Sequence, residues 1–365
     1  MTTALQPTTI AELQAMVTAA RWVSVRGGGS KPALSKPPAG AVCIDLRRLS
    51  GTTARGADEF TYTACAGTPL QKVVDDLAGR AQYLPFDPLQ VRCGATLGGT
   101  VAANLCGSGS YRYGGVRNFL VGVQFVDGRG RLVRCGGQAS ENAAGIDLPK
   151  FFVGSLGRYG ILTEVSVRVF PRLPCYMTLA VAYPGLAAAQ QAAFRLATEP
   201  LDLDALDLEP AEGTAFQLLV RVGGLEAGLP ERMARLEAFL QGEHARLPQQ
   251  LLLGHQESER WERINNLSWV PHGVPLLKVP LAPRQVVELD ARIPCLARRY
   301  TAGGSVAWLA LDDLKPARTV LTDMGLVGLR VLGRGGNPFV GVRRGMLLAR
   351  RVKRALDPAG KFGEA

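Results

Sequence analysis

The chain has 365 residues, of which 47% are hydrophobic and 20% are charged, a composition typical of a globular protein. This length exceeds one ordinary core and predicts two domains, or one domain with a large insertion. No apolar run approaches the roughly 20 residues that a membrane helix needs, and the first residues, MTTALQPTTIAEL, lack the layout of a signal peptide. We therefore expect a cytoplasmic protein without a transmembrane segment.

The formal net charge of +11 is spread along the chain, mostly as single arginines or short pairs such as Arg47-Arg48. Nucleic-acid-binding proteins usually concentrate basic residues on one element or place aromatic residues between them. We therefore expect no nucleic-acid partner, and an acidic protein or a small anionic substrate fits this charge better.

The seven cysteines lie far apart, form no C-x-x-C pair and are odd in number. This pattern argues against a disulfide framework, a zinc site or an iron–sulfur cluster bound by this chain alone. No metal site is predicted, and most cysteines are expected to be small buried hydrophobic residues.

The first part of the chain predicts two helices and three strands. Thr9 to Glu12 fits a capping box for a helix that runs to about Ala20. Thr68-Pro69 predicts the next helix, with threonine as its cap and proline in the first turn. The strands are expected at 22–25, at 42–46 and in the alternating sequence FTYTACAG at 60–67.

A long loop rich in glycine and small residues follows at 84–115, and its regularly placed apolar residues favour a functional loop over a disordered one. The sequence FLVGVQFVDGRGRLVRCGG predicts a hairpin with its turn at 127–130, and a further strand follows GSLGRYG. Pro171 and Pro174 then mark a change in composition, so we predict a domain boundary at 172. Beyond it, the pattern predicts an antiparallel sheet with helices on one face, and a final amphipathic helix with a Pro-Gly stop.

The glycine loop RGGGS at 26–30 follows the first predicted strand. It is not a G-x-G-x-x-G motif, because Pro32 takes the place of the third glycine, and the P-loop sequence is absent. The remaining pattern of strand, glycine turn, coil and strand allows successive N–H groups to form an anion nest for a pyrophosphate, with Arg26 or Ser30 in further contacts. A flexible surface turn is the alternative, and the loop alone does not decide between them.

A second stretch, GATLGGTVAAN at 94–104, has the small residues that let backbone lie against a flat ring. A tightly packed helix start is the alternative for this stretch. Two such stretches in one domain nevertheless favour a bound group that needs close backbone approach.

Six motifs of the chain occur in an order that resembles that of the FAD-binding domains of the vanillyl-alcohol oxidase (PCMH-type) family, over residues 8–172. Within that family the chain resembles the FAD-binding E subunits of glycolate oxidases, in ENAAGIDLPKFFVGSLG and in the tail ALDPAGKFG, although Glu141 and Ile146 depart from the subunit's pattern. Residues 173–340 match only weakly. The motifs are RGGGS at 26–30, GTPL at 67–70, GATLGGTVAAN at 94–104, Tyr113-Gly114 with Arg117, Gly145 with Asp147, and GSLGRYGILTE at 154–164.

The resemblance implies an α+β fold with three parts. They are a two-subdomain FAD-binding domain at 1–172, an antiparallel, ferredoxin-like cap domain at 173–340, and a C-terminal helix and tail at 341–365 that return to the FAD domain. It also implies noncovalent FAD, because Ser30 and Lys31 stand where some relatives attach the flavin to a histidine. The implied cofactor-binding residues are Arg26, Gly27, Gly28, Gly29, Ser30, Gly94, Ala95, Thr96, Gly98, Gly99, Ala102, Asn104, Tyr113, Gly114, Gly160, Ile161, Leu162 and Thr163.

By the same resemblance the protein is a FAD-dependent oxidoreductase for a small 2-hydroxy acid, a reaction that needs a base near neutral pH. The chain has only His244, His255 and His272, and it lacks the H-x-x-D-G-x-x-H element of many hydroxy-acid dehydrogenases of this superfamily. His272 is the candidate base, and a surface-loop histidine is the alternative.

The missing element favours a companion flavoprotein in a glycolate oxidase complex. The base would then lie on a second FAD-binding subunit, and electrons would leave through an iron–sulfur subunit. Two alternatives stay open: a stand-alone FAD-dependent 2-hydroxy acid dehydrogenase, and a redox-inactive assembly subunit with the same fold. The complex would be cytoplasmic, or peripheral to the inner membrane through its partners.

Overall fold

The computed structural model describes residues 4–35, 37–56, 60–136, 147–241, 249–333 and 336–363. Four residues singled out in the sequence, Glu141, Gly145, Ile146 and His244, lie outside these ranges. In the described part of the chain, no helix has the length and apolar character needed to cross a membrane.

The N-terminal elements follow the predicted order. Helix α1 (Ile10–Ala19) is capped by Thr9, whose hydroxyl accepts from the N–H of Glu12 at 3.2 Å. The Glu12 carboxylate also accepts from the N–H of Thr8 at 2.7 Å, so its reciprocal contact reaches the residue before the cap. Strands β1 (Val23–Arg26) and β2 (Val42–Asp45) pair in parallel.

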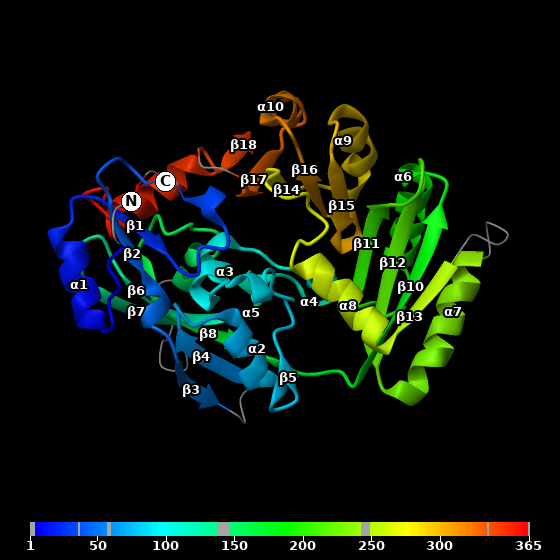
Figure 1. The fold of residues 1–365 in the computed structure, drawn as a ribbon, viewed down its shortest axis with the longest axis horizontal. Helices are drawn as coiled ribbons and strands as arrows, with labels where there is room; N and C mark the ends of the chain where they lie inside the picture. Colours follow the sequence, from blue (N-terminus) through cyan, green and yellow to red (C-terminus); the bar gives the residue numbers. More distant parts are fainter. Residues whose placement is uncertain are drawn as a thin grey trace.

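A five-stranded antiparallel sheet forms the larger part of the N-terminal half, on the left of Figure 1. Helices α2 (Leu70–Ala78) and α3 (Leu97–Ala103) pack on it, with Val73, Leu97 and Val165 in one buried cluster. The hairpin predicted around 127–130 is confirmed. In sheet order the strands are β3 (Thr52–Gly56), β4 (Thr61–Cys65), β8 (Ile161–Arg168), β6 (Leu120–Val126) and β7 (Leu132–Gly136).

The predicted cap of α2 differs from the observed one. Pro69 is the N-cap residue of α2, and no side chain caps this helix. The Thr68 hydroxyl instead accepts from the N–H of Gly51 at 2.9 Å. It therefore ties the start of α2 to the turn before β3. Short elements connect this region: β5 (Gln82–Tyr83), α4 (Ser110–Tyr113), α5 (Val116–Phe119) and β9 (Phe170–Pro171).

The second sheet has nine antiparallel strands in the order β13-β10-β12-β11-β15-β16-β14-β17-β18, on the right of Figure 1. Successive side chains of its long strands point to opposite faces of the sheet, and both faces are buried. The strands are β10 (Cys175–Tyr183), β11 (Ala205–Pro210), β12 (Phe216–Gly224), β13 (Gln249–Leu253), β14 (Leu276–Pro280), β15 (Ala297–Thr301), β16 (Val306–Ala310), β17 (Val327–Leu332) and β18 (Phe339–Gly341).

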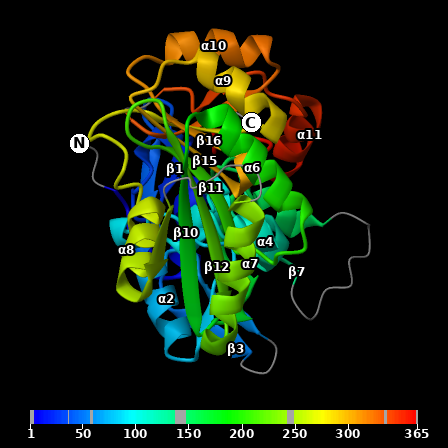
Figure 2. The ribbon, with the colours of Figure 1, turned by 90° about the vertical axis from the view of Figure 1, so that its right-hand side faces the viewer.

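The helices of this half cover both faces of the sheet, and the prediction that they share one face is wrong. Helices α6 (Leu186–Thr198), α7 (Leu229–Gln241), α9 (Val286–Arg292) and α10 (Leu314–Asp323) pack on one face. Helix α8 (Gly254–Asn265) packs on the other, where Trp261 and Ile264 contact Ala180 and Leu219. Figure 2 shows α8 and the pair α6 and α7 on opposite sides of β10 and β12.

The nine-stranded sheet meets the N-terminal half through a mixed apolar and ionic contact. Leu34 and Leu105 from the N-terminal half pack with Leu276 and Trp308 from the sheet. Beside them, the ammonium group of Lys278 donates to the carbonyl of Asn104 at 2.8 Å.

The cysteines differ from expectation. All seven are free, as the absence of a disulfide pattern predicts, but six are only half-buried and Cys93 is exposed. The prediction that most are buried is therefore wrong.

The C-terminal helix α11 (Met346–Leu356) lies beside the N-terminal half in Figure 1. Asp357 holds this return in place, because its buried carboxylate accepts from Lys353 Nζ and from the N–H groups of Lys361 and Phe362. The N–H of Val23 donates to the carbonyl of Lys361, which extends the contact to β1.

We expect Asp357→Ala to lower the free energy of unfolding by about 3 kcal/mol, because it leaves the ammonium group of Lys353 buried without its carboxylate. Urea denaturation measures the change. The control is Asp323→Ala, which removes an exposed ion pair to Arg292 and should cost less than about 1 kcal/mol. Equal losses in the two variants would contradict the role of Asp357.

Candidate functional site

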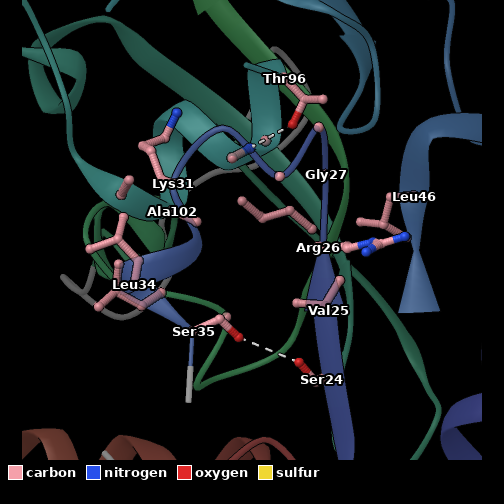
Figure 3. A pocket seen from close by; sticks show the side chains of 18 of the residues that line it. Ser24, Val25, Arg26, Gly27, Lys31, Leu34, Ser35, Leu46, Thr96 and Ala102 are labelled. Atoms are coloured by element: carbon pink, nitrogen blue, oxygen red, sulfur yellow. Dashed lines mark hydrogen bonds between the residues drawn. The ribbon is translucent and has the colours of Figure 1, made fainter. Parts of the chain in front are cut away.

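Three segments far apart in the sequence form most of the lining of an open cavity of about 410 Å³ in the N-terminal half. They are the end of β1 with the loop that follows it, helix α3, and the turn before β8 (Figure 3). Leu34, Leu46 and Ala102 contribute apolar side chains to the lining, and Gly27 and Gly28 contribute backbone.

The glycines of the RGGGS loop are needed mainly for contact with the second glycine-rich stretch. A Cβ atom on Gly28 would lie 1.6 Å from the carbonyl oxygen of Gly94, and one on Gly27 would lie 2.2 Å from Oγ1 of Thr96. Gly29 has φ +72°, in the left-handed region that favours glycine. Glycine was expected at these positions because it leaves room for a ligand. The close approach of two loops is a second reason.

Most of the predicted cofactor residues lie together in the lining of this cavity. The lining contains Arg26, Gly27, Gly28, Gly29, Ser30, Thr96, Gly98, Gly99, Ala102, Gly160 and Leu162. The lining does not contain Gly94, Ala95, Asn104, Tyr113, Gly114, Ile161 or Thr163.

The residues outside the lining support its walls or belong to other sites. In β8, Leu162 lines the cavity whereas Ile161 is packed in the neighbouring core, since adjacent residues of a strand face opposite sides. Tyr113 packs edge-on against Phe170 and lines a separate cleft between α2 and α8. The carbonyl of Asn104 binds Lys278.

The side chain of Arg26 points away from the cavity in Figure 3. Its guanidinium binds the buried carboxylate of Asp45 at 3.1 Å, and Arg47 binds the same carboxylate at 2.7 Å. Burial alone would raise the pKa of Asp45, but the hydrogen bonds from Arg47 and Arg26 outweigh it and lower this pKa to about 2. Arg26 is thus committed to an ion pair, and its backbone is the part available to a ligand.

Lys31 is a cation of the lining that lacks a carboxylate partner among the described residues. Its ammonium group donates to the hydroxyl of Ser30 at 2.9 Å. Burial lowers the pKa of Lys31 to about 8, because desolvation disfavours the charged form. An anionic ligand in the cavity would stabilise this charge.

Ser155 gives a direct test of whether the cavity suits a polar ligand. It lines the cavity, is only 4% exposed, and its hydroxyl has no hydrogen-bond partner among the described residues. A buried hydroxyl without a partner is costly, and a ligand oxygen or nitrogen would satisfy it. The glycine backbone of the lining, the lysine without a described carboxylate partner and the hydroxyl without a described partner together fit a phosphate-bearing cofactor such as FAD.

Several lining residues were missed by the sequence analysis. Ser155, Leu156 and Gly157 belong to the GSLG block, whose position in the motif was the available signal. Leu34 and Ser35 carry no local signal, because they reach the cavity only through the path of the loop.

The structure does not bring the predicted base to the cavity. His272 is exposed in the turn before β14, and His255 is exposed on α8 beside Glu259. Neither lines the cavity. Within the described ranges, no group of three or more histidine, cysteine, aspartate or glutamate side chains is placed to hold a metal ion.

Comparison with known proteins agrees with this geometry. Residues 2–136 match the family model described as FAD binding domain. The match supports FAD as the cofactor of this mixed α/β chain. The chain is 38% identical over 148 residues to glycolate oxidase subunit GlcE of Escherichia coli, over 40% of this chain and 42% of that protein.

Other relatives match over similar shares. Glycolate oxidase subunit GlcD of Bacillus subtilis is 28% identical over 155 residues, which are 42% of this chain and 33% of that protein. D-lactate dehydrogenase of Archaeoglobus fulgidus is 29% identical over 203 residues, which are 55% of this chain and 44% of that protein. The matches thus span less than half the length of each of these relatives.

A solved structure of alkyldihydroxyacetonephosphate synthase has the same fold along the whole chain. The TM-score is 0.74 at 15% sequence identity, and the match covers 98% of this chain and 76% of that one. At this identity the likeness concerns the fold alone.

We expect Gly28→Ala to weaken FAD binding by about tenfold or more, because the added Cβ would collide with the carbonyl of Gly94 and separate the two loops. The ratio of flavin to protein absorbance after purification measures it. The control is Gly228→Ala, where a Cβ would meet no atom within 4 Å. Full flavin content in the Gly28 variant would contradict the proposed loop contact.

We expect Ser155→Ala to weaken FAD binding by about 0.5–1.5 kcal/mol while leaving the FAD-free protein equally stable or more stable. The reason is that the hydroxyl lacks a partner until a ligand supplies one. Fluorescence titration and thermal denaturation measure the two effects. Thr100→Val is the control, because this buried hydroxyl also lacks a described partner but does not line the cavity. Unchanged FAD affinity in the Ser155 variant would argue against the contact.

Proposed function

We propose that the protein is a FAD-dependent oxidoreductase that acts as one flavin-bearing subunit of a glycolate oxidase-like complex. Its substrate class is the small 2-hydroxy acid, and its flavin passes on the electrons of that oxidation. The matches to subunits GlcE and GlcD support a multi-subunit assembly, and the match to D-lactate dehydrogenase supports the substrate class.

The observation that carries this proposal is the composition of the cavity lining. Its described residues include no histidine, aspartate or glutamate, so it lacks the usual base for removing the hydroxyl proton of a 2-hydroxy acid. When bound, FAD supplies hydride and electron transfer. A base on a partner subunit would complete the reaction.

The residues of this chain then serve to hold the cofactor. The N–H groups of Gly27 to Ser30 would bind the pyrophosphate, and Lys31 would balance its charge. Ser155 would donate or accept a hydrogen bond along the cofactor. Binding is noncovalent, because Ser30 and Lys31 occupy the position of the histidine that some relatives use.

We assign the cofactor to a domain at 1–172, contacts with substrate or partner subunits to a cap domain at 173–340, and the return to the first domain to residues 341–365. The positions of the two large sheets on either side of residue 172 support this division.

The partners are a second FAD-binding subunit and an iron–sulfur subunit, and the complex is cytoplasmic or peripheral to the inner membrane through them. On α11, Leu347 and Leu348 are 80% and 56% exposed beside the exposed Arg350 and Arg351. This helix is therefore a candidate docking face for an acidic partner.

A stand-alone 2-hydroxy acid dehydrogenase is a second candidate, and Lys31 is the observation that favours it. Its pKa of about 8 would let a fraction of the amine act as a base near neutral pH. A redox-inactive assembly subunit is the third candidate, and it needs no flavin turnover.

We expect the purified protein to be yellow, to release its flavin into solution on acid precipitation, and to keep its flavin oxidised with glycolate or D-lactate. Absorbance near 450 nm, about the usual flavin maximum, measures each step. Bleaching by glycolate would instead support the stand-alone enzyme, and loss of that bleaching in a Lys31→Met variant with full flavin content would identify the base. Protein that takes up no FAD would reject the flavin function altogether.

A further inference from the structure

A second space of about 420 Å³ adjoins the FAD cavity, and nothing in the proposed function uses it. The two spaces share Ser24, Val25, Ser35 and Gly157 in their linings. The Ser24 and Ser35 hydroxyls lie 3.4 Å apart where the spaces meet, at the bottom of Figure 3. A ligand here would therefore lie next to a bound cofactor.

The far wall of this second space carries two arginines on one aromatic ring. The guanidinium carbon of Arg158 lies 4.8 Å from the ring centre of Phe339, and that of Arg343 lies 4.1 Å from the same centre. Arg158 comes from the turn before β8, whereas Phe339 belongs to the edge strand β18 of the other sheet. The wall thus joins the two halves of the molecule.

The positive charge that Arg158 brings to this wall is not balanced by a described carboxylate. Arg158 forms no ion pair with a described residue. Lys353 donates to the carbonyl of Arg158, which adds a third cation to the group. The nearby carboxylate of Asp357 is already bound to Lys353 and to two backbone N–H groups.

The electrostatic cost of this arrangement is seen in the pKa of Arg158. Burial and the charge of Arg343 lower the pKa of Arg158 to about 10, although this guanidinium stays protonated at neutral pH. A half-buried cation held near another cation is stabilised by an anion that enters the space. A planar guanidinium fits a carboxylate especially well, through two parallel hydrogen bonds.

We propose that the space beside Arg158 binds a small carboxylate, and that this carboxylate belongs to the 2-hydroxy acid of the proposed function. Arg158 is the anchor, and Phe339 packs on the apolar part of the ligand. The pyrophosphate of the cofactor is the other possible anion, but the RGGGS loop that would hold it does not line this space. The inference rests on the proposed function, because it takes its substrate class from there.

The test uses FAD-loaded protein and oxalate, a two-carbon carboxylate with no C–H bond to oxidise. We expect saturable oxalate binding by titration calorimetry, at least about tenfold weaker binding in Arg158→Met, and partial recovery in Arg158→Lys. Arg318→Met is the control, because it removes the same charge from an exposed position on α10. It should bind oxalate as the wild type does.

Each alternative outcome is distinct. No saturable oxalate binding by flavin-loaded wild type, equal affinity in Arg158→Met, or equal weakening in Arg318→Met would overturn the carboxylate subsite and leave the flavin function standing. Loss of FAD from both folded Arg158 variants would show that Arg158 holds the cofactor instead, and would also overturn it. A wild-type protein that binds no FAD would reject the proposed function itself. Presence or absence of oxalate binding by that protein would then support or overturn the carboxylate subsite by itself.

Discussion

The site depends on the close contact between two backbone segments, at Gly28 and Gly94. No side chain fits between them, since a Cβ on Gly28 would lie 1.6 Å from the carbonyl oxygen of Gly94. The contact fixes the loop after β1 against the start of α3, where Thr96 is the cap. The same loop then continues to Leu34, which packs against the nine-stranded sheet. One segment therefore shapes the cavity and holds the second half of the molecule against it.

Uncompensated positive charge is the second constraint on the site. Lys31 lines the FAD cavity and Arg158 lines the adjoining space, and neither forms an ion pair with a described residue. Burial lowers the pKa of each, so their charged forms cost free energy in the ligand-free protein. An anion that binds only the folded state recovers that cost and adds stability.

The sequence predicted the parts of the site that consist of continuous sequence motifs. The RGGGS loop, the second glycine-rich stretch and the turn before β8 are each continuous segments, and the structure brings all three to one cavity. The hairpin and the C-terminal helix were also predicted, because turn residues and helical periodicity act over a few residues.

The rest depends on pairing between distant residues, which one sequence does not reveal. The ion pair of Arg26 with Asp45 occupies the guanidinium, so that the backbone of Arg26 is the part that lines the cavity. Helix α8 has an ordinary amphipathic pattern that does not specify which face of the sheet it covers. Ser35 and Leu34 reach the cavity through the course of the loop, and no motif marks them.

Helix α3 links the cofactor loop to the nine-stranded sheet. At its start, Thr96 contacts the RGGGS loop, and at its end Asn104 has φ 51° and turns its carbonyl to Lys278. A cation at the last carbonyls of a helix is favourable, because these groups lack partners within the helix. Lys278 is buried and binds no described carboxylate, so this carbonyl is its main polar contact. A movement of the sheet that broke this bond would leave a buried ammonium group unsatisfied, and this cost opposes separation of the sheet from the end of α3.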